Sequence, residues 1–306
     1  MTKLIFLLAF HQLTSLDTRL DLRKIYMQKI LVALNNSRFS ESTLEYAIHL
    51  SKMTSAHLIG VFLDETINAG PALFQVAGED TGIVVENTVK KSITKRAGVT
   101  GRSVKKFEAR CKAASVKFTK REAIGYSVAD LIKETIHADL LVIHIRETSN
   151  DSAETLPSHF LKNLLTGTRC PVLLAPDWFT PITSVAALYN GDASSALAVK
   201  MFSYLFPELD DVKIQFINLN NDEASLEIPG SKNMREWVEG HFSNAGYNII
   251  TGNSRDHLIR EIKRHHYGSL IIAGAYQRSL LSMLLHPSLA DSLIKRLAEP
   301  IFIAHY

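Results

Sequence analysis

The strongest constraint on the fold of this chain is an internal repeat with a spacing of about 130 residues. Three short segments of the first half recur in the same order in the second half: residues 139–144 (DLLVIH) with 269–274 (SLIIAG), 156–158 (LPS) with 286–288 (HPS), and 170–175 (CPVLLA) with 299–304 (EPIFIA). A similarity that recurs at a fixed spacing indicates copies of one structural unit. The sequence therefore predicts a tandem duplication.

Each copy is predicted to hold strands that alternate with helices. Short apolar runs predict strands at residues 30–34, 57–63, 116–124, 139–144 and 170–175 in the first copy, and at 185–189, 212–218, 247–251, 269–274 and 299–304 in the second. After the first strand, Ser40 is expected to cap a helix with Leu44, Ala47 and Ile48 on its inner face. The matching helix is expected from about Ser194, with Leu197, Met201, Phe202 and Leu205 inward.

This order of elements predicts an α/β fold made of two tandem, doubly wound parallel-sheet sandwiches. Prolines near the midpoint place the expected boundary between a first domain at residues 27–176 and a second at 177–306, and residues 1–26 are expected to form an extension. The apolar run at 4–10 is too short to span a membrane, which takes about 20 residues. The chain has two cysteines, which excludes a disulfide framework and favours the cytoplasm.

The arrangement resembles the universal stress protein family in its tandem two-domain form. The resemblance rests on the polar turn after the first strand and on three segments, which are residues 139–143 (DLLVI), 170–174 (CPVLL) and 274–280 (GAYQRSL). Nucleotide-binding members carry an acidic residue after the first strand and a loop of the form Gly-x2-Gly-x9-Gly-Ser/Thr after the fourth. Glycines and helix N-terminal amides in such a loop bind phosphate.

Both copies depart from this pattern. In the first copy the three glycine positions hold His144, Glu147 and Pro157, and the acidic position holds Asn35. A carboxylate at Glu147 repels a triphosphate, so we expect no ATP binding of the family's kind there. The second copy has Gln277 and Pro287 at the later glycine positions, and retains the candidate ligand-binding residues Asn190, Gly191, Gly274, Arg278, Ser279 and Ser288. Two interpretations of these six stay open, a site for ATP or AMP and an ordinary loop.

The remaining sequence patterns do not predict a group of catalytic residues. The phosphate-loop and nucleophile-elbow motifs are absent. Basic residues are dense between Lys90 and Arg121, but Val104, Phe107, Cys111 and Ala114 follow helical spacing, which favours a solvated helix over a nucleic-acid surface. His257, Glu261 and His265 lie four residues apart and suit either zinc or ion pairing; ion pairing is the expectation, with no metal.

The resemblance implies a cytoplasmic stress-response protein with a binding or regulatory role, and not an enzyme. It also implies that the fifth strands pair, so that the two domains form an intramolecular pseudo-dimer. The alternative is a protein that binds ATP or AMP through the second copy, with slow hydrolysis or none. A homodimer and unidentified protein partners are compatible with both hypotheses, whereas a membrane or nucleic-acid partner is not expected.

Overall fold

The computed structural model describes residues 27–63, 101–121, 126–148, 156–220, 230–251, 255–274 and 289–304. Within each half strands and helices alternate, and a further helix covers residues 101–113. The N-terminal half contains β1 (Lys29–Asn35), α2 (Glu41–Thr54), β2 (His57–Leu63), β3 (Phe118–Lys120), α4 (Val128–Thr135), β4 (Leu140–His144), α5 (His159–Gly167) and β5 (Val172–Ala175). The C-terminal half contains β6 (Ser184–Leu188), α6 (Ala193–Leu205), the 3-10 turn η4 (Pro207–Leu209), β7 (Lys213–Asn220), α7 (Ser231–Glu239), β8 (Ala245–Thr251), α8 (Arg255–His265), β9 (Leu270–Gly274), α10 (Leu289–Arg296) and β10 (Ile301–Ala304).

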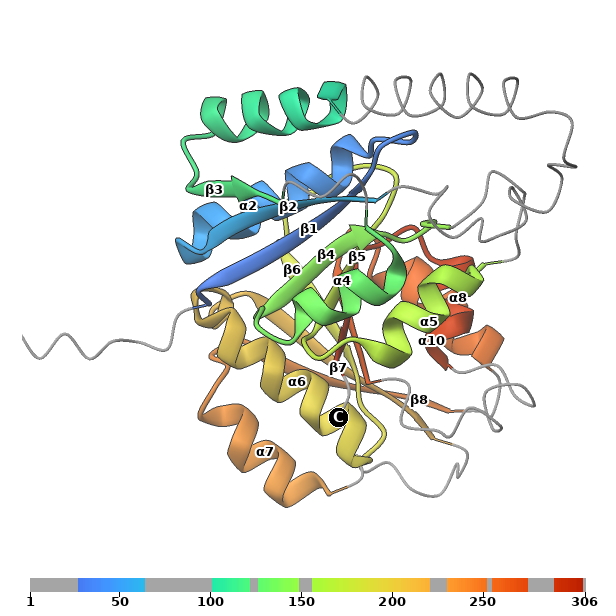
Figure 1. Cartoon of the computed structure of the whole chain (residues 1–306). Coiled ribbons are helices and arrows are strands. Elements are labelled where there is room, and N and C mark those ends of the chain that lie inside the picture. Colours follow the sequence, from blue (N-terminus) through green and yellow to red (C-terminus); the bar gives the residue numbers. More distant parts are fainter. Residues whose placement is uncertain are drawn as a thin grey trace, which may run out of the picture.

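The ten strands found in the described ranges belong to one sheet, in the order β3-β2-β1-β4-β5-β10-β9-β6-β7-β8. The five strands of each half follow the same spatial order, and neighbours within a half are parallel. The two halves meet where β5 and β10 pair antiparallel, with Leu173 opposite Phe302. In Figure 1 the blue-to-green half lies in the upper part of the view, and α6 and α7 lie in the lower part.

A local detail recurs in both halves. The N–H of Leu141 in β4 donates to the carbonyl of Pro171 at 3.0 Å, and the N–H of Ile271 in β9 donates to the carbonyl of Pro300 at 2.9 Å. Proline lacks an N–H, so it is tolerated at the start of a strand, where its carbonyl still joins the ladder.

Helices cover both faces of the sheet. On one face α2, residues 101–113, α6 and α7 pack over a core that includes Val32, Phe107 and Phe302. On the other face α4, α5, α8 and α10 pack over a core that includes Leu31, Leu161 and Ile303. Alternate residues of β1 and β10 enter opposite cores because strand side chains alternate between faces. The predicted α/β fold is confirmed.

Two local expectations differ from the structure. The described part of the third strand is short, because β3 covers only Phe118–Lys120, and the expected end near residue 124 lies outside the described residues. In α6 the buried face includes Ala198 and Val199, whereas Leu197 is only half-buried. The expectation for Leu197 was wrong, whereas Phe202 and Leu205 are buried as expected. No helix in the described ranges is long and apolar enough to cross a membrane.

Candidate functional site

A pocket of about 510 Å³ opens at the carboxyl ends of β1 and β4. These strands are neighbours, but the chain leaves them in opposite directions, toward β2 and toward β5. Open α/β sheets bind ligands at this type of switch point, and the volume falls in the range of small-molecule sites. The residues that line the pocket are Arg38, Phe39, Ser40, Glu41, His144, Arg146, Glu147 and Asp177.

Two residues that line the pocket, Arg38 and Glu147, are held by Asn35, the last residue of β1, which is 1% exposed. Its side-chain oxygen accepts the N–H of Ser37 at 2.9 Å and the N–H of Arg38 at 3.1 Å, which holds the polar turn after the strand. Its amide group donates to Glu147 Oε1 at 2.7 Å. The amide that occupies the family's acidic position therefore holds the turn and the segment after β4.

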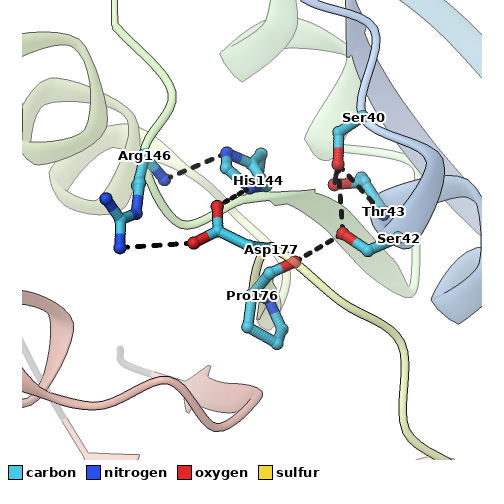
Figure 2. Close-up of polar contacts among 7 residues, drawn as sticks. All are labelled: Ser40, Ser42, Thr43, His144, Arg146, Pro176 and Asp177. Carbon is cyan, nitrogen blue, oxygen red and sulfur yellow. Dashed lines mark hydrogen bonds and ion pairs between the residues drawn. The ribbon is translucent and has the colours of Figure 1, made fainter.

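One wall is the first turn of α2. The N–H of Thr43 donates to the Ser40 hydroxyl at 3.2 Å, and the Thr43 hydroxyl donates to it at 2.8 Å. Ser42 donates to the carbonyl of Pro176, just beyond β5. As Figure 2 shows, these hydroxyls lie between the helix and the segment that leaves the N-terminal half. The predicted Ser40 cap is confirmed.

The opposite wall carries His144, Arg146 and Asp177 (Figure 2). Asp177 Oδ1 lies 3.3 Å from His144 Nε2, and Asp177 Oδ2 lies 3.2 Å from Arg146 Nη2. The backbone N–H of Arg146 donates to His144 Nδ1 at 3.3 Å. Burial lowers the pKa of His144 from its ordinary value of 6.5, and the Asp177 carboxylate only partly offsets this effect. The ring is therefore neutral at neutral pH, with its proton on Nε2.

This geometry does not form a Ser-His-Asp triad. A general base needs a ring nitrogen that accepts the proton of a hydroxyl, but Nδ1 of His144 accepts a backbone N–H and Nε2 faces Asp177. The Ser40 and Ser42 hydroxyls lie 3.2 Å apart, within hydrogen-bond distance of each other. Ser40 also accepts the N–H of Thr43, and Ser42 donates to the carbonyl of Pro176. The described residues of the pocket are thus equipped to bind and orient a ligand.

In the segment that follows His144, polar groups form hydrogen bonds with other groups of the chain. Glu147 is 5% exposed, and its Oε1 atom accepts the N–H of Thr148 at 3.3 Å as well as the Asn35 amide. Ser158 donates to the carbonyl of Glu147 and caps α5 by accepting the N–H of Leu161 at 3.1 Å. The backbone of Glu147 is therefore tied to the N-cap of α5, while its buried carboxylate is held by Asn35 and Thr148. A carboxylate in this segment opposes the positive charge that a bound phosphate needs.

In the C-terminal half, three of the predicted ligand-binding residues meet at the first turn of α6. The amide of Asn190 donates to Asp192 Oδ2 at 2.6 Å, and Gly191 has a φ of 85°, which glycine adopts without strain. A Cβ added to Gly274 would lie 2.4 Å from the carbonyl oxygen of Ser194. Each of the three has a local structural role. Arg278, Ser279 and Ser288 lie outside the described residues.

Comparison with known proteins now adds to this geometry. Residues 27–176 match the model of the universal stress protein family. The chain belongs to this family through these residues. A universal stress protein from Archaeoglobus fulgidus is similar in structure, with a TM-score of 0.59 and 13% identity over 92% of this chain and 98% of that one. A putative universal stress protein from Pseudomonas aeruginosa gives 0.54 and 13% over 91% and 93%. No curated protein sequence matches significantly.

Asp177 and Arg146 were not predicted from the sequence as site residues. A signal for both was present: Arg146 follows β4 by two residues and Asp177 follows β5 by two residues. Because β4 and β5 are parallel neighbours, with His144 opposite Ala175, the residues after them emerge at one edge of the sheet. The glycine positions of the family's loop, on which the sequence prediction rested, include neither of these two charged residues.

Two other sequence patterns have structural explanations. In the described part of the basic stretch, four cationic side chains pair with acids of the same or neighbouring elements, namely Lys106 with Glu41, Arg110 with Glu45, Lys120 with Glu108, and Arg121 with Glu134. On α8, Glu261 lies 3.8 Å from His257 and 3.2 Å from His265. The described residues contain no group of three or more His, Cys, Asp or Glu arranged to hold a metal ion.

Proposed function

We propose that this chain is a tandem universal stress protein that acts in the cytoplasm by binding and regulation, without an efficient chemical step on a nucleotide. Its domains would be residues 27–176 and 177–306, preceded by an extension at 1–26. The antiparallel pairing of β5 with β10 supports an intramolecular pseudo-dimer, because each half contributes its fifth strand to the junction. Such pairing also removes two exposed strand edges.

The observation that carries this proposal is the charge of the N-terminal pocket. It is lined by three carboxylates (Glu41, Glu147 and Asp177) and two guanidiniums (Arg38 and Arg146), and His144 fills the position of the first loop glycine. A triphosphate brings several negative charges, and the excess of carboxylates over guanidiniums leaves the pocket without the net positive charge that would balance them. The pocket therefore favours a small ligand of low charge, and among its described residues both ring nitrogens of His144 are already engaged.

The test is calorimetric titration of the full chain with Mg-ATP, combined with an assay of phosphate release. We expect no saturable binding at the N-terminal pocket and no hydrolysis above background. A saturable ATP complex that is lost in Arg146→Ala and retained in Lys105→Ala, which removes an exposed charge from another surface, would contradict the proposal.

A second candidate is an adenine-nucleotide site for ATP or AMP in the C-terminal half. It is supported by the meeting of Asn190, Gly191 and Gly274 at the first turn of α6. A fluorescent ATP titration of Arg278→Ala tests it, since loss of saturable binding is expected if this guanidinium holds the phosphate. Unchanged binding would remove the candidate. Light scattering coupled to size-exclusion chromatography would show whether the whole chain dimerises.

A further inference from the structure

Asp177 bridges two donors with its two carboxylate oxygens. Oδ1 faces Nε2 of His144 at 3.3 Å, and Oδ2 faces Nη2 of Arg146 at 3.2 Å (Figure 2). Because His144 Nδ1 accepts a backbone N–H, the ring proton lies on Nε2 and points at the carboxylate. A cationic guanidinium and a ring N–H thus converge on one anionic group, which is a geometry suited to carboxylate or phosphate oxygens.

The two donors differ in exposure. His144, the last residue of β4 at the switch point of the sheet, has a side chain that is 18% exposed, whereas the side chains of Arg146 and Asp177 are 60% and 42% exposed. His144, Arg146 and Asp177 all line the 510 Å³ pocket, together with the first turn of α2. The carboxylate therefore lies where a ligand's charged group would meet the protein.

The segment that carries Asp177 is held by other contacts. Ser42 donates to the carbonyl of Pro176, and the N–H of Thr180 donates to the Tyr46 hydroxyl at 3.2 Å. The ring of Phe179 packs edge-on against Tyr46, with centroids 4.9 Å apart. Removal of the Asp177 charge therefore leaves the segment attached to α2, and the carboxylate is not needed to fix its path.

We propose that Asp177 is a built-in anion that occupies an oxyanion subsite formed by His144 and Arg146. The subsite binds the phosphate or carboxylate group of a small ligand when the Asp177 carboxylate withdraws. This inference rests on the proposed function of the pocket and specifies how that pocket is regulated. Glu41 and Glu147 remain in the wall and restrict the ligand to a single anionic group.

The test is the Asp177→Asn variant, titrated calorimetrically with inorganic phosphate, acetate, AMP and adenosine. We expect phosphate and AMP to bind Asp177→Asn at least about tenfold more tightly than they bind the unmodified chain. The reason is that the Asp177 carboxylate no longer competes with the ligand's anion for charged hydrogen bonds. Adenosine, which has no anion, is expected to show no gain. A gain with acetate as large as with phosphate identifies a carboxylate subsite, and a gain with phosphate alone identifies a phosphate subsite.

Three controls decide the interpretation. Asp210→Asn makes the same charge change before β7, at the amino ends of the strands, and is expected to give no gain. Asp177→Asn combined with Arg146→Ala is expected to lose the gain. Asp177→Ser provides a second neutral replacement, and circular dichroism checks that each variant is folded.

The outcomes separate this inference from the proposed function. Equal anion affinity in Asp177→Asn and the unmodified chain overturns the inference, as does a gain that persists without Arg146. If no variant binds an anion, the inference fails while the absence of nucleotide chemistry stands. If the unmodified chain binds Mg-ATP as tightly as Asp177→Asn does, both proposals fail.

Discussion

Gly274, at the end of β9, lies against the backbone of Ser194 in the first turn of α6. A Cβ at position 274 would stand 2.4 Å from the Ser194 carbonyl oxygen and 2.7 Å from the N atom of Ser195. Both are backbone atoms, which do not yield as a flexible side chain does. The glycine is therefore required by the close approach of a helix and a strand, whatever its role in ligand binding.

Gly274→Ala is expected to lower the free energy of unfolding by about 1–3 kcal/mol, the usual cost of overpacking. Urea denaturation followed by circular dichroism measures this change. Gly101→Ala is the matched control, because a Cβ at Gly101 meets nothing described within 4 Å. A stability for Gly274→Ala equal to that of the control would contradict the packing role. Larger substitutions at Gly274 are unsuitable as tests of nucleotide binding for the same reason.

Phe302→Ala is expected to destabilise both halves together. Phe302 is fully buried in β10, pairs with Leu173 across the junction, and packs against Phe202 and Phe206. Truncation of a buried phenylalanine costs about 3–5 kcal/mol. Native-state hydrogen exchange is expected to show parallel loss of protection in β1 and β6. Tyr267→Ala, at a side chain that is 78% exposed, is the control. Unchanged protection of β1 would mean that the halves are independent.

The two cysteine thiols are expected to be unreactive in the folded chain at pH 8. Burial raises the pKa of both Cys111 and Cys170 from 9.0 to about 12. Since the thiolate is the nucleophile, a thiol reagent should label the cysteines only after unfolding. Rapid labelling of the native protein would contradict this.

The same shifts predict a loss of stability at high pH. The thiol pKa in the folded chain lies above that in the unfolded chain. The contribution of the protonated thiols to the free energy of unfolding is therefore complete below pH 9 and is lost as the pH rises toward 12. Urea midpoints measured from pH 8 to pH 11 test this slope. A double Cys→Ala variant is expected to show a shallower decline than the unmodified chain.

His144 is expected to titrate below pH 6.5. Burial lowers its pKa, so protonation favours the unfolded chain, and this contribution to stability is present above pH 6.5 and lost as the pH falls. Proton NMR of the histidine ring resonances gives the midpoint, and the signal that disappears in His144→Gln assigns it. A midpoint above 6.5 would mean that Asp177 outweighs burial.

The fold and the N-terminal pocket differ in how far local sequence predicts them. The apolar runs at β1, β2, β4 and β5 and the Ser40 cap are local signals, and the structure places them as expected. The pocket depends on residues far apart in the chain, such as Asn35 with Glu147 and His144 with Asp177. Residue identities alone did not reveal these pairs, because the sheet order that brings them together is set by packing.

The sequence by itself determined the class of this protein: repeated apolar strands, alternating helices and prolines before the fifth strands specify a doubly wound α/β chain, because the period of the apolar residues is a local property. Only the tertiary structure decided what happens at the carboxyl ends of those strands. There Asp177 reaches His144 and Arg146, and the first turn of α6 closes on Gly274, because parallel pairing brings distant segments to one edge of the sheet.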